Sequence, residues 1–283
     1  MISHNPKPIR HILLFMCLGV MTVFTITCVT IVPRSTQTPV PVTETSSATA
    51  TSTAKPSSTF TATPPPAWIA DFAEPILEAI ANRPPTYQDD FSNPASGWYI
   101  GTTTGHPDVL ISGDRRYSNG EYRVIANGAT TAEPTVCSGG PDENVGIHAD
   151  FVAEFDVRFV SGNEGDWQIQ FHRIDKGLYS LSLDRDNVVR FSKCDPTPGC
   201  EGIASYSGGQ INDGQEWNHM LLIVRGAKMA AYTNGSPILY LDDKTYSDKF
   251  RAGDFSLSVC NGGIVPMETR WDNFRLWDIS DLP

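Results

Sequence analysis

The sequence carries little positive charge and no concentration of it. Its 283 residues include 21 lysines and arginines against 32 aspartates and glutamates, which gives a formal net charge of −11 at pH 7. No basic stretch is interleaved with aromatic residues. Since nucleic-acid binding relies on Lys and Arg to neutralise phosphates, the composition argues against a nucleic-acid partner.

Several catalytic signatures are also missing. There is no Ser/His/Asp order, no glycine-rich phosphate loop and no His-Glu-x-x-His helix. What is present is 23 glycines and 21 prolines, a content typical of many turns joining short strands.

The N-terminus contains an apolar run at 12–32 with no charged residue, preceded by Lys7 and Arg10. At 1.5 Å per residue this run spans about 30 Å, the thickness of a bilayer core. The positive-inside rule then places residues 1–11 in the cytoplasm and the rest of the chain outside. We expect a single-pass cell-membrane protein whose C-terminal domain is extracytoplasmic. A cleaved signal peptide, or a lipid on Cys28, is the alternative.

Two different segments follow the apolar run. Residues 33–66 consist mainly of Ser, Thr and Pro, so they cannot form a packed core and are predicted to be a disordered linker. In 67–84, apolar residues recur at three- and four-residue spacing, which predicts one short amphipathic helix or two, with Pro75 kinking the helix or beginning a second turn. This helix either covers the next domain or docks on a partner or membrane.

From 85 to 283 the apolar pattern has a period of two. Strands are predicted at 121–126, 151–160, 167–172, 179–184, 188–193, 217–225, 228–233, 238–241, 255–260 and 270–277. Asp186-Asn187 and Asn234-Gly235 are typical of tight hairpin turns. The sequence therefore predicts an all-β domain, a two-sheet antiparallel sandwich with one polar outer face.

Four cysteines lie in this domain, where the expected compartment permits oxidation. Cys194 and Cys200 are close enough in sequence to close a short loop, which would leave Cys137 to pair with Cys260. This is one of three connectivities. A zinc site is the alternative, although Cys-x5-Cys without a second pair is a weak zinc signal.

A series of short motifs runs through the domain. The motifs are Asp89-Asp90-Phe91-Ser92, Gly97-Trp98, Asn119-Gly120-Glu121-Tyr122, Gly165-Asp166-Trp167, Tyr179-Ser180-Leu181, Glu216-Trp217-Asn218, Tyr232-Thr233-Asn234-Gly235 and Trp271-Asp272-Asn273-Phe274. Their order and spacing resemble the concanavalin A-like lectin/glucanase superfamily, and most of all the laminin G-like and 3-keto-disaccharide hydrolase-like domains of bacterial surface proteins. The resemblance implies a jelly roll whose first and last strands pair. It also implies carbohydrate as the commonest ligand and calcium in some branches.

The catalytic residues of the related enzymes are incomplete here. Family 16 glucanases carry Glu-x-Asp-x-x-Glu on one strand, whereas this chain has Glu154, Asp156 and then Phe159 in place of the third carboxylate. Ser180 and Ser182 stand where the keto-disaccharide branch has Glu and Gln. Hydroxyls without a base do not replace an acid/base carboxylate, so the resemblance favours binding over catalysis.

Sugar binding needs flat aromatic faces and planar hydrogen-bonding side chains. Candidate ligand-binding residues on the polar face are Arg158, Gln168, Gln170, His172, Glu154 and Asp184, with Trp98 at the border or packed in the core. Asp90 and Asp272, on the terminal strands, are candidates for calcium or for turn hydrogen bonds. The sequence thus predicts a membrane-anchored carbohydrate-binding module. A glycoside-processing enzyme of the 3-keto-disaccharide hydrolase type is the second hypothesis, and a structural or adhesive spacer is the third.

Overall fold

The computed structural model describes residues 65–106, 109–132, 135–140, 142–174, 177–195, 199–247 and 250–283. The predictions for 1–64, which cover the cytoplasmic N-terminus, the membrane segment and nearly all of the linker, lie outside the described residues. Within the described ranges, every helix is too short or too polar to cross a membrane.

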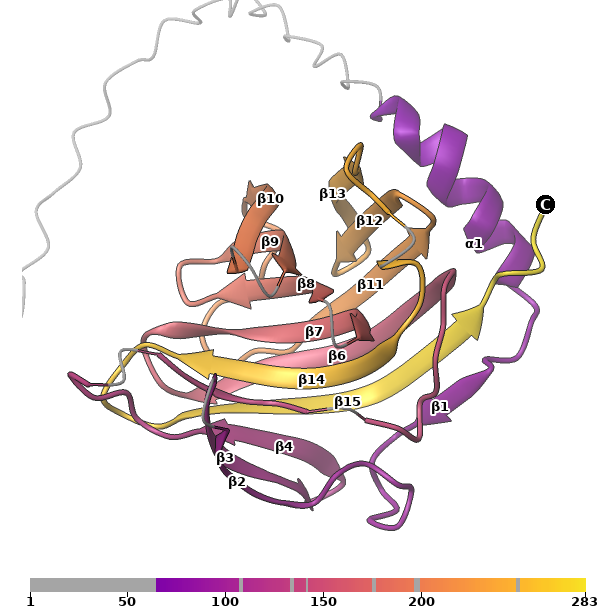
Figure 1. Cartoon of the computed structure of the whole chain (residues 1–283). Coiled ribbons are helices and arrows are strands. Elements are labelled where there is room, and N and C mark those ends of the chain that lie inside the picture. The colour runs from indigo at the N-terminus through magenta and orange to yellow at the C-terminus, as the bar shows by residue number, and fades with distance from the viewer. Residues whose placement is uncertain are drawn as a thin grey trace, which may run out of the picture. The chain divides into compact units, whose positions relative to one another are not determined.

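The domain is built from two β-sheets, shown in Figure 1. In spatial order, sheet 1 contains β2 Gly101–His106, β3 Val109–Ser118, β4 Glu121–Ala126, β15 Met267–Asp278, β6 Phe151–Ser161, β11 Asn218–Arg225, β12 Lys228–Thr233 and β13 Ser236–Asp242, with β1 Tyr87–Asp89 paired to β15. Sheet 2 contains β10 Gly199–Ser207, β9 Val188–Asp195, β8 Gly177–Asp184, β7 Gly165–Ile174, β14 Asp254–Asn261 and β5 Val136–Ser138. All pairings are antiparallel except a single parallel contact between β3 and β5.

The core lies between the two sheets because alternate residues of each strand point inward. Phe155 of sheet 1 packs against Trp167 of sheet 2, and Trp271 contacts both rings. All three side chains are fully buried. The predicted all-β sandwich is confirmed, and so is the pairing of the first and last strands, with Asp89 opposite Phe274.

Four strands were not predicted, namely β2, β3, β5 and β10. β10 is mostly exposed and begins Gly-Cys-Glu-Gly, so it lacks an apolar alternation. β3 contains Gly113 followed by Asp114, Arg115 and Arg116. A Cβ on Gly113 would lie 1.9 Å from the Ile125 carbonyl oxygen, so this strand depends on a glycine that usually weakens strands.

The segment before the sandwich forms a π-helix, Ile69–Ala73, continued by the α-helix α1, Glu74–Ile80. Pro75 is the second residue of α1, directly after the π-helix, so its missing N–H falls where the hydrogen-bond pattern changes from the π to the α type. Phe72, Ile76 and Ile80 pack on Val152, Ile223 and Ala230, which project from the outer face of sheet 1. The helix therefore covers part of this outer face, beside the C-terminal end of β15 (Figure 1).

Both disulfides are confirmed. Cys137–Cys260 joins β5 to β14, and Cys194–Cys200 joins β9 to β10. Each links residues that are directly opposite on neighbouring strands.

The consecutive strands β6 and β7 belong to different sheets. β6 pairs with β15 and β11, while β7 pairs with β14 and β8. The short turn 162–164 therefore crosses from sheet 1 to sheet 2. As a consequence, polar residues on β6 and β7 point to opposite sides of the sandwich.

Candidate functional site

The outer face of sheet 2 is polar along β7 and its two neighbours, β8 and β14. On β7 it carries Asp166, Gln168 and Gln170, which alternate with the buried Trp167, Ile169 and Phe171. The pairing places Ser182 and Ser258 beside Gln168, and Ser180 and Ser256 beside Gln170. Short hydroxyl side chains on both sides leave the long amides as the prominent groups of this face.

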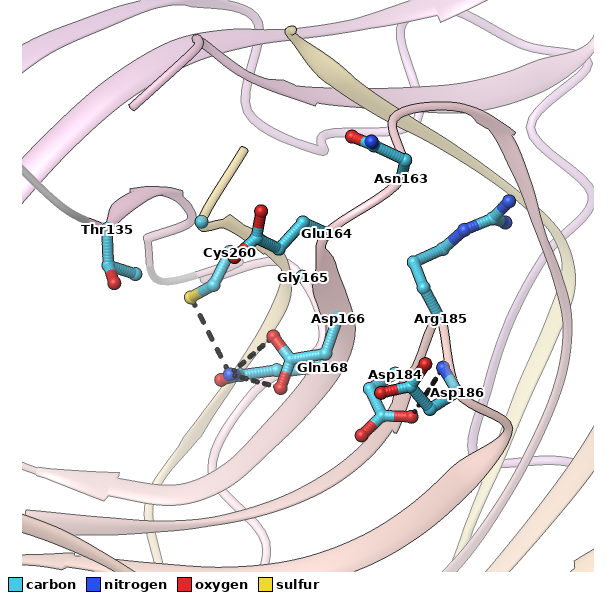
Figure 2. A pocket seen from close by; sticks show the side chains of 11 residues that line it. Thr135, Asn163, Glu164, Gly165, Asp166, Gln168, Asp184, Arg185, Asp186 and Cys260 are labelled. Atoms are coloured by element: carbon cyan, nitrogen blue, oxygen red, sulfur yellow. Dashed lines mark hydrogen bonds between the residues drawn. The ribbon is translucent and has the colours of Figure 1, made fainter. Parts of the chain in front are cut away.

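One end of this face is hollowed into a cleft of about 610 Å³, shown in Figure 2. The residues that line it are Thr135, Asn163, Glu164, Gly165, Asp166, Gln168, Asp184, Arg185, Asp186, Cys260 and Gly262. Gly165 lets β7 approach β14 closely, because its φ is +137° and a Cβ would lie 2.1 Å from the Cys260 carbonyl oxygen. This close approach sets Glu164 and Asp166 at the cleft wall.

Three side chains of β7 form a one-directional row of hydrogen bonds, which we call the amide ladder (Asp166, Gln168 and Gln170). Gln170 Nε2 donates to Gln168 Oε1 at 3.1 Å. Gln168 Nε2 donates to both carboxylate oxygens of Asp166, at 3.1 and 3.2 Å, and lies 3.6 Å from Cys260 Sγ (Figure 2). The ladder thus ends on a carboxylate inside the cleft.

The surroundings of Asp166 disfavour the charged form of its carboxyl group. Burial raises its pKa to about 6, the hydrogen bond from Gln168 opposes this, and the negative charge of Asp184 adds to the rise. Asp184 lies directly opposite on β8. The cleft therefore contains a carboxyl group that titrates close to neutral pH.

Asp184 is held by its own turn. Its Oδ1 accepts the backbone N–H groups of Asp186 at 2.9 Å and Val188 at 3.0 Å, and its Oδ2 accepts Arg190 Nη1 at 2.5 Å. These bonds close the β8–β9 hairpin at Asp186-Asn187, as predicted. Asp184 thus lines the cleft while most of its acceptor capacity is used within the protein.

Arg158 and Glu154 do not share a face with Gln168 and Gln170, so the prediction that they lie together is wrong. Both lie on β6, on the outer face of sheet 1. Arg158 donates to Glu121 at 2.7 Å and stacks 4.6 Å from the Trp217 ring centre. The alternation of apolar and polar residues correctly predicted that each of these side chains points outward. It does not predict which of the two sheets, and so which outer face, the side chain belongs to.

Glu154 belongs to a second charged cluster on sheet 1 that the sequence reasoning missed. His219 Nε2 lies 2.9 Å from Glu154 Oε1, and His219 Nδ1 lies 2.7 Å from Asp156 Oδ1. The hydrogen bonds with Asp156 and Glu154 raise the pKa of His219 to about 9. Because both carboxylates bind one imidazolium, they form a structural ion cluster and not a free acid/base pair.

Replacing His219 with Gln should flatten the dependence of stability on alkaline pH. A raised folded-state pKa means that the stabilising contribution of His219 is complete below about 6.5 and is lost as pH rises through about 9. Urea denaturation at pH 7 and pH 10 measures the change. Arg275→Gln, which removes a neighbour 3.5 Å from Glu154, should keep the wild-type pH dependence. Parallel profiles for wild type and His219→Gln would contradict this assignment.

His172 is not on the polar face, so that prediction is also wrong. A bulge shifts the register of β7 against β8 between Phe171 and Ile174, and His172 adopts a φ of +49° there. The imidazole is fully buried against Phe151, Phe171 and Tyr179, with Nε2 2.6 Å from the Ala149 carbonyl oxygen. Burial lowers its pKa.

Trp98 lies in the core, 3% exposed, where it contacts Phe91, Tyr122 and Phe274. Core packing was the alternative to a ligand-stacking role, and the structure supports core packing.

The two candidate calcium ligands make local hydrogen bonds. Asp90 accepts the Ser92 backbone N–H and hydroxyl, and Asp272 accepts the Asn273 backbone N–H. In the described part of the chain, no three His, Cys, Asp or Glu side chains are grouped as a metal site would require. The arrangement matches the turn role that was the alternative to calcium.

Most of the cleft residues were not singled out from the sequence. Asp166 precedes Gln168 by two positions, so the same alternation that selected Gln168 and Gln170 would have selected it. The signal for Asn163 and Glu164 was weaker, because residues of a turn follow no period. Thr135, just before β5, and Cys260, on β14, are distant in the sequence, and only the fold brings them to the cleft.

No known family model matches the sequence, and no curated protein matches it. Solved structures do match. The laminarinase catalytic domain from Thermotoga maritima MSB8 aligns with a TM-score of 0.52 at 12% identity, over 69% of this chain and 98% of that one. A non-specific endo-β-1,3(4)-glucanase from family GH16 aligns with a TM-score of 0.51 at 12% identity, over 68% of this chain and 89% of its own. A carbohydrate binding module, CBM66 from Bacillus subtilis, covers 64% of this chain and 95% of its own at 18% identity, with a TM-score of 0.40. The two glucanases share the concanavalin A-like jelly-roll fold with this domain.

Proposed function

We propose that the protein is a membrane-anchored, extracytoplasmic binding module that holds a carbohydrate in the cleft of sheet 2 without cleaving it. The observation that carries the proposal is the amide ladder and its surroundings. The cleft presents carboxylate, amide and hydroxyl groups from β7, β8 and adjoining turns within one hollow of about 610 Å³. Saccharides, whose surfaces are dense in hydroxyl groups, bind to such sets of planar acceptors and donors.

Hydrogen bonding within the cleft favours binding over hydrolysis. A retaining glycosidase requires one carboxylate that is free to attack carbon and a second, protonated carboxyl group about 5 Å away. Here Asp184 accepts three hydrogen bonds from its own hairpin, and Asp166 accepts Gln168 on both oxygens. Neither carboxylate is free in the way a nucleophile needs to be.

One observation favours the second hypothesis, a glycoside-processing enzyme such as one of the 3-keto-disaccharide hydrolase type. Asp166 of β7 and Asp184 of β8 are directly opposite on neighbouring strands, and the pKa of Asp166 is raised to about 6. Carboxyl pairs in unequal environments are a common acid/base arrangement. The same purified protein therefore has to be assayed for turnover as well as for binding.

A glycan array tests the proposal with the full chain, using immobilised β-1,3-glucan, β-1,4-glucan and chitin oligosaccharides and other neutral glycans. We expect saturable binding that weakens about tenfold in Gln168→Ala, because a ligand group and Asp166 would both lose a partner. Gln215→Ala, which removes an exposed glutamine bonded to the Val160 carbonyl outside the cleft, should bind as wild type does.

Two results would overturn the proposal. Absence of binding to every glycan would leave the spacer hypothesis. Release of shorter products, abolished in Asp166→Asn or Asp184→Asn, would instead establish the enzyme.

A further inference from the structure

The amide ladder has a direction that is fixed from one end. An ionised carboxylate only accepts hydrogen bonds, so Gln168 must turn its NH2 group toward Asp166. The carbonyl oxygen of Gln168 then faces Gln170, which must supply its own NH2 group. The charge on Asp166 therefore sets the orientation of both amides.

Among the described residues, the charged groups near Asp166 come from β8, β9 and the turns at the ends of β7 and β8. Asp184 lies opposite on β8 and is paired with Arg190 of β9. Glu164 precedes β7, and Arg185 and Asp186 lie in the β8–β9 turn. On β14 the neighbour is Cys260, which is held in a disulfide and does not titrate. Carboxylates outnumber the cations around this cleft, so uptake of a proton by Asp166 relieves repulsion.

We propose that the amide ladder is a proton-controlled selector of the ligand: while Asp166 is ionised, the ladder offers acceptors to the hydroxyl groups of a saccharide, and when Asp166 takes up a proton, the ladder reverses and the saccharide is released. This inference rests on the proposed carbohydrate-binding function. It assigns Asp166 as the residue that makes binding depend on pH.

Reversal follows from one proton. A protonated Asp166 gains one O–H donor and keeps one acceptor oxygen. When this O–H points along β7, its acceptor on the ladder is the carbonyl oxygen of Gln168, which a half-turn of the Gln168 amide brings to face it. Its NH2 group then faces Gln170, which must also rotate to offer a carbonyl oxygen. Asp166 then offers the ligand one neutral acceptor oxygen in place of a charged carboxylate, and the other end of the ladder, at Gln170, presents an NH2 group in place of a carbonyl oxygen.

The sign of the pH effect follows from which form binds. If the ionised form binds the ligand, affinity is full above the pKa of Asp166, about 6, and falls below it by up to about tenfold per pH unit. We therefore expect glycan binding by the full chain to be about tenfold weaker at pH 5.0 than at pH 7.5.

The array described above, run at both pH values, tests this with two variants. Asp166→Asn keeps the shape of the carboxyl group but has no charge and can donate, so it should bind weakly at both values and lose the pH dependence. Asp242→Asn changes a carboxylate of β13 that lies outside this cleft and pairs with Lys244, and it should keep the pH dependence of the wild type.

Side-chain NMR supplies a second readout that needs no ligand. The NH2 resonances of Gln168 and Gln170 should shift together with a single midpoint near pH 6, and should not shift in Asp166→Asn. Equal glycan binding at pH 5.0 and 7.5, or amide resonances that do not titrate, would overturn the inference while leaving the proposed function intact. Absence of glycan binding at both pH values would overturn the proposed function and this inference with it.

Discussion

Replacing both Cys137 and Cys260 with alanine should lower the free energy of unfolding by about 5 kcal/mol. The bridge closes a loop of 123 residues, and chain-entropy arithmetic assigns a bond of this span close to that value. β5 is only three residues long, so few backbone hydrogen bonds support the disulfide in holding it to β14. Denaturation in urea under non-reducing conditions measures the loss.

The second disulfide is the matched control. Cys194–Cys200 closes a loop of only six residues, so Cys194→Ala/Cys200→Ala should lose about 2 kcal/mol by the same arithmetic. Equal losses for the two double variants, or a larger loss for the short bridge, would contradict the account. Because Cys260 also lines the cleft, we expect the long-bridge variant to bind glycans less well than the short-bridge variant.

Arg115→Met should destabilise the fold by about 3–5 kcal/mol. Arg115 and Asp142 form an ion pair 2.5 Å long in which both side chains are buried. Arg115 also donates to the Tyr122 hydroxyl and the Gly140 carbonyl. Without the guanidinium, Asp142 would remain buried, so burial would raise its pKa further and it would take up a proton or force local unfolding.

Two further variants make this prediction specific. Arg115→Met/Asp142→Asn removes the stranded charge and keeps an acceptor for the Leu257 backbone N–H, so it should recover part of the loss. Arg116→Met removes a half-exposed arginine from its ion pair with Asp114 and should cost far less than Arg115→Met does, because solvent screens an exposed pair. A loss below about 1 kcal/mol in Arg115→Met itself would show that the buried pair does not stabilise the domain.

The all-β architecture followed from periodicity because its central strands alternate clearly. β4 and β12 have the residue bounds that the alternation of apolar and polar residues predicts, and β6, β7 and β14 differ by a few residues at their ends. The disulfide pairing followed from loop length. These features are determined by residues that are close in the sequence, so a local sequence pattern can predict them.

The sequence pattern did not predict which of the two sheets each strand joins. β6 and β7 are separated by a three-residue turn, a spacing typical of a hairpin within one sheet. Instead the chain crosses the core there, and Arg158 and Gln170 lie on opposite walls. Strand pairing depends on contacts between residues that are distant in the sequence. The alternation of apolar and polar residues along one strand gives no information about these contacts.

Local exceptions account for the remaining differences at the site. The bulge at His172 turns one side chain inward against the alternation, and nothing in the residue itself marks a bulge. Asp166 and Gln168 lie on the same face by the same rule, so the floor of the cleft could be predicted in part. Its walls, from Thr135 to Asp186, required the fold.

The most direct test of the central claim is to locate bound saccharide by NMR, using backbone amide shifts of the full chain titrated with the array glycan that binds most tightly. The proposal predicts that the shifts concentrate at 163–168, 184–186 and 260–262. Shifts concentrated on sheet 1 around His219 or Arg158, with the cleft residues unchanged, would contradict it.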